Sequence, residues 1–211
     1  MIPRRLLVVA AGLVGAAFLW RWVSRRRVLP CPWWATWLVE NPLMEHVAGA
    51  DVLFGRVGLA PGMAVLDVGC GPGRLAVPAA EWVGPVGRVV ALDVQPRMLE
   101  RVRQRAARRG LMNLETVLAG AGEGALPEAA FDRAFLVTVL GEVPDRRGAL
   151  REIAGALKPG GVLSVTELLP DPHFQPRRRV LELATAVGLE PGETFGPAGL
   201  YTIHLHKPAT G

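Results

Sequence analysis

Cysteine, lysine and tyrosine are scarce in this chain, and the few cysteines argue against a zinc-binding or disulfide-rich protein. The 211 residues include two cysteines, Cys31 and Cys70, which lie far apart and outside any CxxC or Cys/His cluster. Their spacing excludes a structural zinc signature and a disulfide framework, although it is compatible with a single bridge. We therefore expect no metal. Two lysines and one tyrosine stand against 22 arginines, and we attribute the arginine excess to codon usage.

Acidic residues are absent from the first 27 positions, which hold six arginines. The net charge of the chain is +5, but without those six residues 18 basic side chains face 19 acidic ones. The remaining chain is therefore close to neutral. A nucleic-acid-binding domain carries its basic charge on the folded surface, so this distribution argues against a nucleic-acid partner.

The longest stretch without a charge, residues 6–20, reads LLVVAAGLVGAAFLW. Extended to Val23 it forms a helix of roughly 27 Å, which just spans a thin bilayer. Trp20 and Trp22 close it, as expected at a membrane interface, and no signal-peptidase site follows. Four arginines follow the stretch and two precede it. We predict an N-terminal transmembrane helix with the body in the cytoplasm, in preference to a signal peptide or a peripheral helix.

Three further tryptophans, Trp33, Trp34 and Trp37, share one face of a short predicted helix that ends before Asn41. They either pack on the body as core or rest in the headgroup layer and hold the body against the bilayer. The predicted division of the chain is an anchor with its basic flank (1–30), tryptophan-rich interfacial or cap helices (31–60) and a ligand-binding domain (61–211).

From residue 61 onward, short apolar runs alternate with amphipathic stretches. The predicted strands are 64–69, 88–94, 114–119, one within 131–140, and 161–169. The predicted helices are 74–83, one that begins at Pro96, one around 150–157 and 181–189, and residues 195–207 read as a closing hairpin. Strands that alternate with helices predict an α/β fold whose parallel sheet is covered on both faces.

The strongest chemical signal is VLDVGCGPG, residues 65–73, in which Gly69, Gly71 and Gly73 stand between a strand and a helix. Glycines at such a turn let the backbone bend sharply and let a ligand touch the main chain. The dinucleotide fingerprint needs a third glycine at position 74, which is Arg74 here. Asp67 also suits a cationic ligand better than a pyrophosphate.

Asp93 stands twenty residues after Gly73, at the end of the second predicted strand. A carboxylate in that place accepts two hydrogen bonds from a ribose diol. The alternative for each piece alone is ordinary turn and capping chemistry. In combination, the glycines, Asp67 and Asp93 favour a ligand that carries a ribose and a positive charge.

Four segments resemble the successive motifs of class I S-adenosylmethionine-dependent methyltransferases. They read VLDVGCGPG, ALDVQPRML, FDRAFLVTVLGEVPD and LREIAGALKPGGVLSVTE, and the resemblance covers roughly residues 40–207. Within the class they are most similar to the ubiquinone/menaquinone C-methyltransferase-like (methyltransferase type 11) group. The resemblance implies a Rossmann-like seven-stranded sheet with one antiparallel strand, and S-adenosyl-L-methionine as the cofactor.

The same resemblance assigns cofactor-binding residues. It places Asp67 and the loop Gly69, Cys70, Gly71, Pro72 and Gly73 near the methionine part of the cofactor. It also implies that Asp93 holds the ribose and that Val94 and Met98 line the adenine.

One segment, LAGAGEGALP (118–127), departs from the family pattern. The family commonly has an acid after the third strand that accepts from the adenine amino group, and here Ala121 or Gly122 stands in its place. Either Glu123 takes this role or backbone carbonyl groups do. The departure leaves an alternative open, namely a non-catalytic S-adenosylmethionine-binding module or scaffold at the membrane.

Two candidate catalytic residues, Glu142 and His173, follow the fourth and fifth predicted strands. Ligands bind at the carboxyl ends of strands in such sheets, and a histidine that titrates near neutral pH suits a general base. The alternative for both is turn chemistry, because prolines flank them. His46 and Tyr201 are weaker candidates.

The predicted membrane anchor narrows the choice of acceptor. It would hold a methyltransferase cleft at the bilayer, which favours a small lipophilic acceptor such as a quinone precursor, a phospholipid headgroup or an isoprenoid. The anchor could equally place the enzyme beside a membrane complex. The sequence predicts no oligomeric state.

Overall fold

The computed structural model describes residues 45, 48–169 and 171–209, and the structural statements below concern these. The predicted transmembrane helix and the tryptophans at 33, 34 and 37 lie outside the described residues, so both calls stay predictions. Within the described part of the chain, no helix combines the length and hydropathy needed to cross a bilayer.

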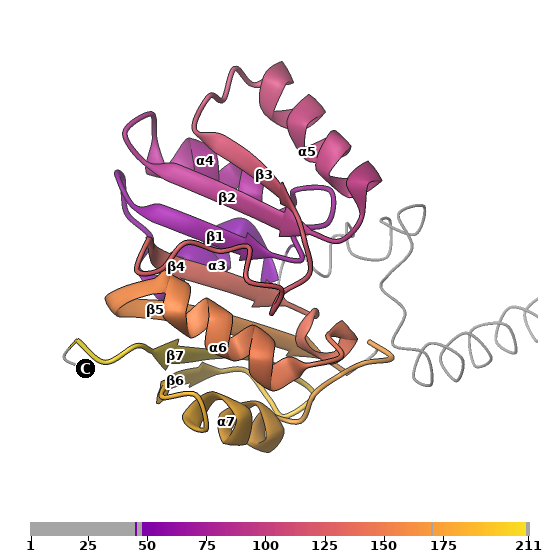
Figure 1. Ribbon diagram of the computed structural model, residues 1–211, viewed down its shortest axis with the longest axis vertical. Coiled ribbons are helices and arrows are strands. Elements are labelled where there is room, and N and C mark those ends of the chain that lie inside the picture. The colour runs from indigo at the N-terminus through magenta and orange to yellow at the C-terminus, as the bar shows by residue number, and fades with distance from the viewer. Residues whose placement is uncertain (1–44, 46–47, 170, 210–211) are drawn as a thin grey trace, which may run out of the picture.

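A seven-stranded sheet with strand order β3-β2-β1-β4-β5-β7-β6 forms the centre of the molecule (Figure 1). Its strands are β1 (Ala64–Val68), β2 (Arg88–Asp93), β3 (Leu114–Leu118), β4 (Phe131–Val137), β5 (Leu157–Leu168), β6 (Glu190–Phe195) and β7 (Leu200–His206). Strands β1 to β5 pair in parallel, and β7 is antiparallel to β5 and β6. The predicted α/β sheet and its closing hairpin are confirmed.

Helices cover both faces of this sheet. One face carries α3 (Ala50–Val57), α4 (Ala76–Val83) and α5 (Pro96–Arg108), and the other carries α6 (Arg146–Ala156) and α7 (Arg177–Thr185). Figure 1 shows α6 and α7 in front of the sheet and α3 and α4 behind it. Each helix buries one apolar stripe against the strands, as its spacing of apolar residues requires.

The helix α3 belongs to the core, although it lies within the predicted cap region 31–60. It buries Leu53, Phe54 and Val57. The ring of Phe54 lies 5.5 Å from that of Phe135 in β4 and 5.6 Å from that of Trp82 in α4. This segment therefore packs against the sheet itself.

Several element boundaries differ from the prediction. The closing hairpin was predicted within 195–207, but its first strand β6 lies earlier, at Glu190–Phe195. Strand β5 begins at Leu157, not at 161, because a register shift between Phe131 and Arg133 lets the segment before Val162 continue to pair with β4. Helix α7 covers Arg177–Thr185, not 181–189. It begins directly after Pro176, whose φ of −61° suits a helix start, and the chain then turns into β6.

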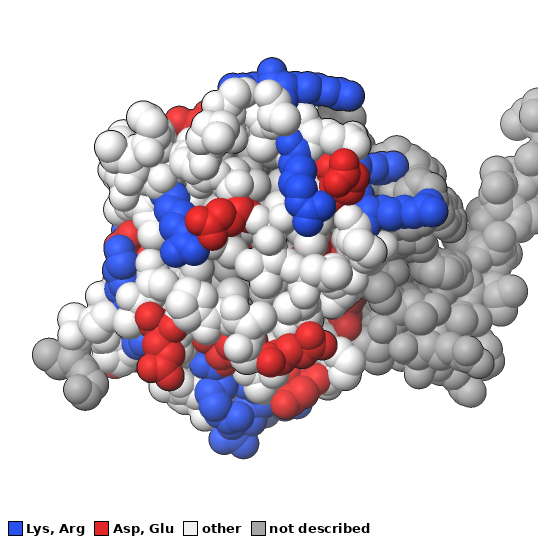
Figure 2. All heavy atoms as spheres, turned by 45° about the horizontal axis from the view of Figure 1, so that its top comes forward, with Lys and Arg blue, Asp and Glu red and all other residues white. Residues whose placement is uncertain are grey.

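The charged surface mixes both signs. Figure 2 shows acidic and basic side chains interspersed over the face in view. Several form ion pairs, such as Arg88 with Glu115 at 2.8 Å and Arg109 with Glu81 at 3.0 Å. Exposed pairs of this kind contribute roughly 0–1 kcal/mol each, so they do not decide the fold.

Candidate functional site

The glycine loop lies between β1 and α4, at the carboxyl end of the sheet. The backbone N–H groups of Gly69 and Cys70 both donate to the carbonyl oxygen of Leu92 in β2, at 2.7 and 3.0 Å. Gly69 has a φ of +67°, and a Cβ there would overlap the methyl groups of Val139. Gly71 also has a positive φ, +52°, but a Cβ there would meet open space. The loop is therefore anchored at Gly69 and open at Gly71.

Asp67 is buried beneath this loop, with 4% of its surface exposed. Its Oδ2 atom is buried and has no hydrogen-bond partner among the described residues. Burial raises the pKa of the carboxyl to about 7, against the opposing effects of the Arg74 guanidinium and a backbone N–H of Ala76. A buried carboxylate oxygen without a partner is costly, so it marks a place for a ligand that donates to it.

Asp93 ties the glycine loop to β2. Its Oδ2 accepts from the N–H of Gly71 at 2.9 Å, and its Oδ1 accepts from the N–H of Gln95 at 2.8 Å. Burial raises the pKa of Asp93, and these N–H groups oppose the shift. Each carboxylate oxygen keeps a second lone pair, so both can still accept from a ribose diol. The carboxylate therefore also positions the loop, which the sequence did not reveal.

Apolar side chains stand beside Asp93 at the ends of two neighbouring strands. Val94 is 51% exposed, and Leu118, the register partner of Asp93 in β3, is 58% exposed. An adjacent pair of exposed apolar residues at this edge suits the face of an aromatic base. Met98 is 3% exposed and buried in α5, so it presents little surface to a ligand. Leu118 was missed because it reads as an ordinary strand residue.

The loop after β3 is held from outside by α6. The N–H groups of Gly122 and Leu126 donate to the two carboxylate oxygens of Glu152, the second at 3.0 Å. Glu123 accepts from the N–H of Gly120 within its own loop, at 2.9 Å, and Ala121 packs against the core. The carboxylate of Glu123 is thus engaged locally, and its role toward an adenine stays a prediction.

The two candidate catalytic residues come from segments that meet. Glu142 ends the 3-10 turn η2 (Leu140–Glu142) after β4, and His173 lies after β5 with 7% of its surface exposed. A Cβ at Gly141, next to Glu142, would overlap the carbonyl oxygen of His173. The structure therefore brings both segments to the carboxyl end of β4 and β5, while their catalytic roles stay predictions.

A further acid, Glu167, lies near the segments of Glu142 and His173, and the sequence analysis did not identify it. It is 1% exposed in β5, and burial raises the pKa of its carboxyl to about 8. Its Oε1 atom is buried without a hydrogen-bond partner among the described residues. The available signal was a lone acid within the apolar run SVTELL, near the end of a buried strand.

Thr138, directly after β4, has a φ of +55°. A β-branched residue in this region is strained by roughly 1–3 kcal/mol, and such strain concentrates at functional sites. Its N–H donates to the carbonyl oxygen of Thr166 in β5 at 2.8 Å, which holds the two strand ends together.

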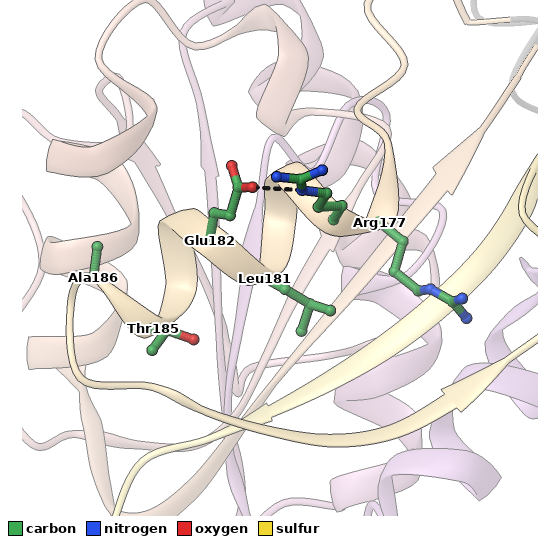
Figure 3. Close-up of a pocket in the computed structure, with 6 residues that line it drawn as sticks. Arg177, Leu181, Glu182, Thr185 and Ala186 are labelled. Atoms are coloured by element: carbon green, nitrogen blue, oxygen red, sulfur yellow. Dashed lines mark hydrogen bonds and ion pairs between the residues drawn. The ribbon is translucent and has the colours of Figure 1, made fainter.

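A surface hollow lies along α7 and is separate from these residues (Figure 3). Among the described residues, its lining comes from α7 and Ala186, and Arg178 there is paired with Glu182 at 2.8 Å. It contains no residue from the glycine loop or from the ends of β1, β2 and β4, so we assign the site to the strand ends instead.

The strand-end residues fit S-adenosyl-L-methionine. The unpartnered Oδ2 of Asp67 suits the ammonium group of its methionine part, and Asp93 suits its ribose. The open space at Gly71 lets a ligand approach the main chain. Val94 and Leu118 offer apolar surface to an adenine.

Comparison with known families supports this assignment. A family model described as "Methyltransferase domain" matches residues 65–161. The matched region runs from β1 into β5 and contains the glycine loop, Asp93 and Glu142. Asp67 lies at its beginning, and Glu167 and His173 lie beyond its end.

Curated proteins with related sequences are methyltransferases. The chain is 33% identical over 118 residues to demethylmenaquinone methyltransferase of Geobacillus kaustophilus (strain HTA426), covering 56% of this chain and 50% of that protein. It is 36% identical over 115 residues to nocamycin O-methyltransferase of Saccharothrix syringae, covering 54% and 41%. The chain spans about half the length of the curated relatives it matches.

A solved structure of a SAM dependent methyltransferase from Aquifex aeolicus has the same fold, with a TM-score of 0.76 at 21% sequence identity. The alignment covers 84% of this chain and 100% of that one. The family match and the related sequences agree with the site at the strand ends, so the chain contains a methyltransferase domain of the class I type, whose cofactor is S-adenosyl-L-methionine.

Proposed function

We propose that this protein is a membrane-anchored methyltransferase that transfers the methyl group of S-adenosyl-L-methionine to a small, lipophilic acceptor. The observation that carries the catalytic part is Asp67, a buried carboxyl with an unpartnered oxygen at the foot of an open glycine loop. The resemblance to class I methyltransferases implies that the methionine part of the cofactor lies at this loop.

When bound, the cofactor would supply a methyl group on a positively charged sulfur: the acceptor bonds to the methyl carbon, the carbon–sulfur bond breaks, and S-adenosylhomocysteine leaves as a neutral thioether. The protein's part in such a reaction is to hold both partners in line and to exclude water. Asp67 and Asp93 fix one partner at the ends of β1 and β2. The segments that contain Glu142 and His173 form the neighbouring wall at the ends of β4 and β5.

A proton must leave the acceptor if the nucleophile is a hydroxyl group or an enol carbon. His173 and Glu142 are the proposed proton acceptors, because their segments meet at this wall. A general base must come within hydrogen-bond reach of the proton it takes, directly or through one water molecule. The assignment predicts that His173→Gln slows methyl transfer while cofactor affinity is kept.

Two observations support a lipophilic acceptor. The N-terminal apolar stretch with its arginines and tryptophans has the pattern of a single-pass anchor. One curated relative is named demethylmenaquinone methyltransferase, and menaquinone is a lipid-soluble quinone. We therefore propose a location at the membrane with the methyltransferase domain on the cytoplasmic side.

Label transfer tests the activity. Purified full-length protein is incubated with methyl-radiolabelled S-adenosylmethionine and a total lipid extract from the source organism, with Asp67→Ala as the control. Label that enters the organic phase only with the unmutated protein supports the proposal, and mass analysis then names the acceptor. Intact cofactor binding without any label argues against a lipid acceptor and favours a soluble acceptor or a non-catalytic binder.

Membrane extraction tests the anchor separately. A spanning helix keeps the protein in the membrane fraction at 1 M salt, where the Debye length is about 3 Å. Release by salt would overturn the anchor and leave only electrostatic association.

A further inference from the structure

We propose that Glu167 is a positioning residue that fixes the segment Asp171–Gln175, and with it His173, against the turn after β4. The inference rests on the proposed function in one respect, because it takes this segment as the acceptor-side wall of the methyl-transfer site. The contacts themselves are independent of the reaction.

The position of Glu167 is set by two neighbouring strands. It lies in β5 opposite Tyr201 of β7, and both residues are 1% exposed. Its Oε2 atom accepts from the backbone N–H of Gln175 at 2.9 Å. The side chain of Glu167 thus joins β5 to Gln175, eight residues further along the chain.

Tyr201 binds the carbonyl side of Gln175. Its hydroxyl group donates to the carbonyl oxygen of Gln175 at 2.7 Å, and its ring lies 6.1 Å from that of Phe174 in an edge-to-face arrangement. The backbone of Gln175 is thus bound at both its N–H and its C=O. Because the two partners stand on paired strands, the sheet itself fixes this residue.

The side chain of Gln175 carries the fixation to His173. Its Nε2 atom donates to the carbonyl oxygen of His173 at 2.7 Å. The N–H of His173 donates to Oδ1 of Asp171. Gly141 closes the other side, since a Cβ there would overlap the backbone of His173. A shift of Gln175 therefore moves His173 relative to the turn that ends at Glu142.

The charges around Glu167 come from several elements. Burial raises the pKa of Glu167 and Asp171 adds to this, while Arg146 of α6 opposes it. Arg146 also donates to the carbonyl oxygens of Leu140 and Gly141, at 3.1 and 2.9 Å. The N–H of Gln175 also opposes the raised pKa of Glu167, since it favours the ionised carboxylate. Oε2 can still accept from Gln175 in either protonation state, so a neutral amide oxygen can replace it.

The variants Glu167→Gln and Glu167→Ala test whether the acceptor oxygen of Glu167 is what holds Gln175 in place. Glutamine keeps an acceptor oxygen of the same reach, and alanine removes it. The probes are amide hydrogen exchange and two-dimensional imidazole spectra of the full chain labelled at histidine, with His173→Gln to assign the signal. Cofactor affinity is measured with S-adenosylhomocysteine.

We expect Glu167→Ala to raise exchange at the Gln175 amide at least tenfold and to shift the imidazole signals of His173. We expect Glu167→Gln to restore both to the wild-type pattern. Affinity for S-adenosylhomocysteine should stay within twofold in both variants. With the lipid extract as acceptor, the alanine variant should lose about tenfold in the rate of label transfer at saturating cofactor.

Unchanged Gln175 exchange and unchanged His173 signals in Glu167→Ala would overturn the proposal. If that variant unfolds, Glu167→Asp decides, because the shorter side chain keeps the carboxyl group but draws its oxygens away from the N–H of Gln175. Wild-type His173 signals in Glu167→Asp would then overturn the proposal, and shifted signals would support it. A failed label-transfer experiment with intact exchange and imidazole results would refute the proposed lipid acceptor and not the positioning role of Glu167.

Discussion

Asp67 and Glu167 have similar local surroundings, and we propose different roles for them. Both are buried acids near the carboxyl ends of parallel strands, both have raised pKa values, and each has one buried oxygen without a partner among the described residues. Asp67 lies beneath an open glycine loop, whereas Glu167 binds the backbone of a neighbouring segment. A buried acid at a strand end therefore marks a candidate functional residue. Its surroundings indicate whether it binds a ligand or positions a neighbouring segment.

The variant Asp67→Asn, with Glu167→Gln as its matched control, tests whether Asp67 binds the cofactor and Glu167 does not. Removing one partner of a buried ion pair costs roughly 3–5 kcal/mol, so Asp67→Asn should weaken S-adenosylhomocysteine binding at least ~100-fold. Glu167→Gln should change it less than twofold. Isothermal titration calorimetry measures both, and equal losses in the two variants would refute the distinction.

Two glycines give the next largest effect. Gly69→Ala combines a positive φ with overlap of Val139, and we expect it to lower the free energy of unfolding by about 2–4 kcal/mol. Gly71→Ala meets open space and should cost about 1 kcal/mol, but it should impair cofactor binding. Urea unfolding and calorimetry compare them. The reverse order of stabilities would contradict the assignment of the open side of the loop.

The pH dependence of stability separates the two acids further. A carboxyl with a raised folded pKa releases its proton earlier in the unfolded chain, so the free energy of unfolding falls as pH rises from the ordinary value to the folded one. For Asp67 this fall spans about pH 4 to 7, and for Glu167 it continues to about pH 8.

Each variant should remove its own part of this fall, roughly 4 kcal/mol for a shift of about three pH units. Asp67→Asn should flatten the curve below pH 7, and Glu167→Gln should flatten it up to pH 8. Urea titrations at several pH values measure this. Saturating S-adenosylhomocysteine should reduce the Asp67 part alone, because its ammonium group stabilises the ionised carboxylate. A ligand effect on the Glu167 part would argue for direct contact with the cofactor.

The smallest expected effect concerns the loop after β3. Glu152→Ala removes the acceptors for Gly122 and Leu126, and loss of these hydrogen bonds should lower cofactor affinity about three- to tenfold. Glu115→Ala, which breaks only the exposed pair with Arg88, is the control and should leave affinity unchanged. Equal affinities in both variants would show that this loop does not shape the adenine side.

Local patterns in the sequence were sufficient for much of the fold. Alternating apolar runs predicted the parallel sheet with helices on both faces, and spaced glycines predicted the loop between β1 and α4. These features depend on residues close in sequence, where periodicity and backbone freedom act directly. The bounds of β5 and α7 were wrong because the register shift in β4 and the helix start at Pro176 outweighed the local apolar pattern.

The sequence by itself determined the fold class and the cofactor, and it predicted which edge of the sheet carries the candidate site. Only the tertiary structure decided which acids have an unpartnered oxygen, that Asp93 also holds Gly71, and that Glu152, thirty residues away, holds the loop at Gly122. Burial and hydrogen-bond partners depend on which strands and helices become neighbours. The sequence orders residues along the chain, whereas the energetics of a carboxylate depend on what surrounds it in space.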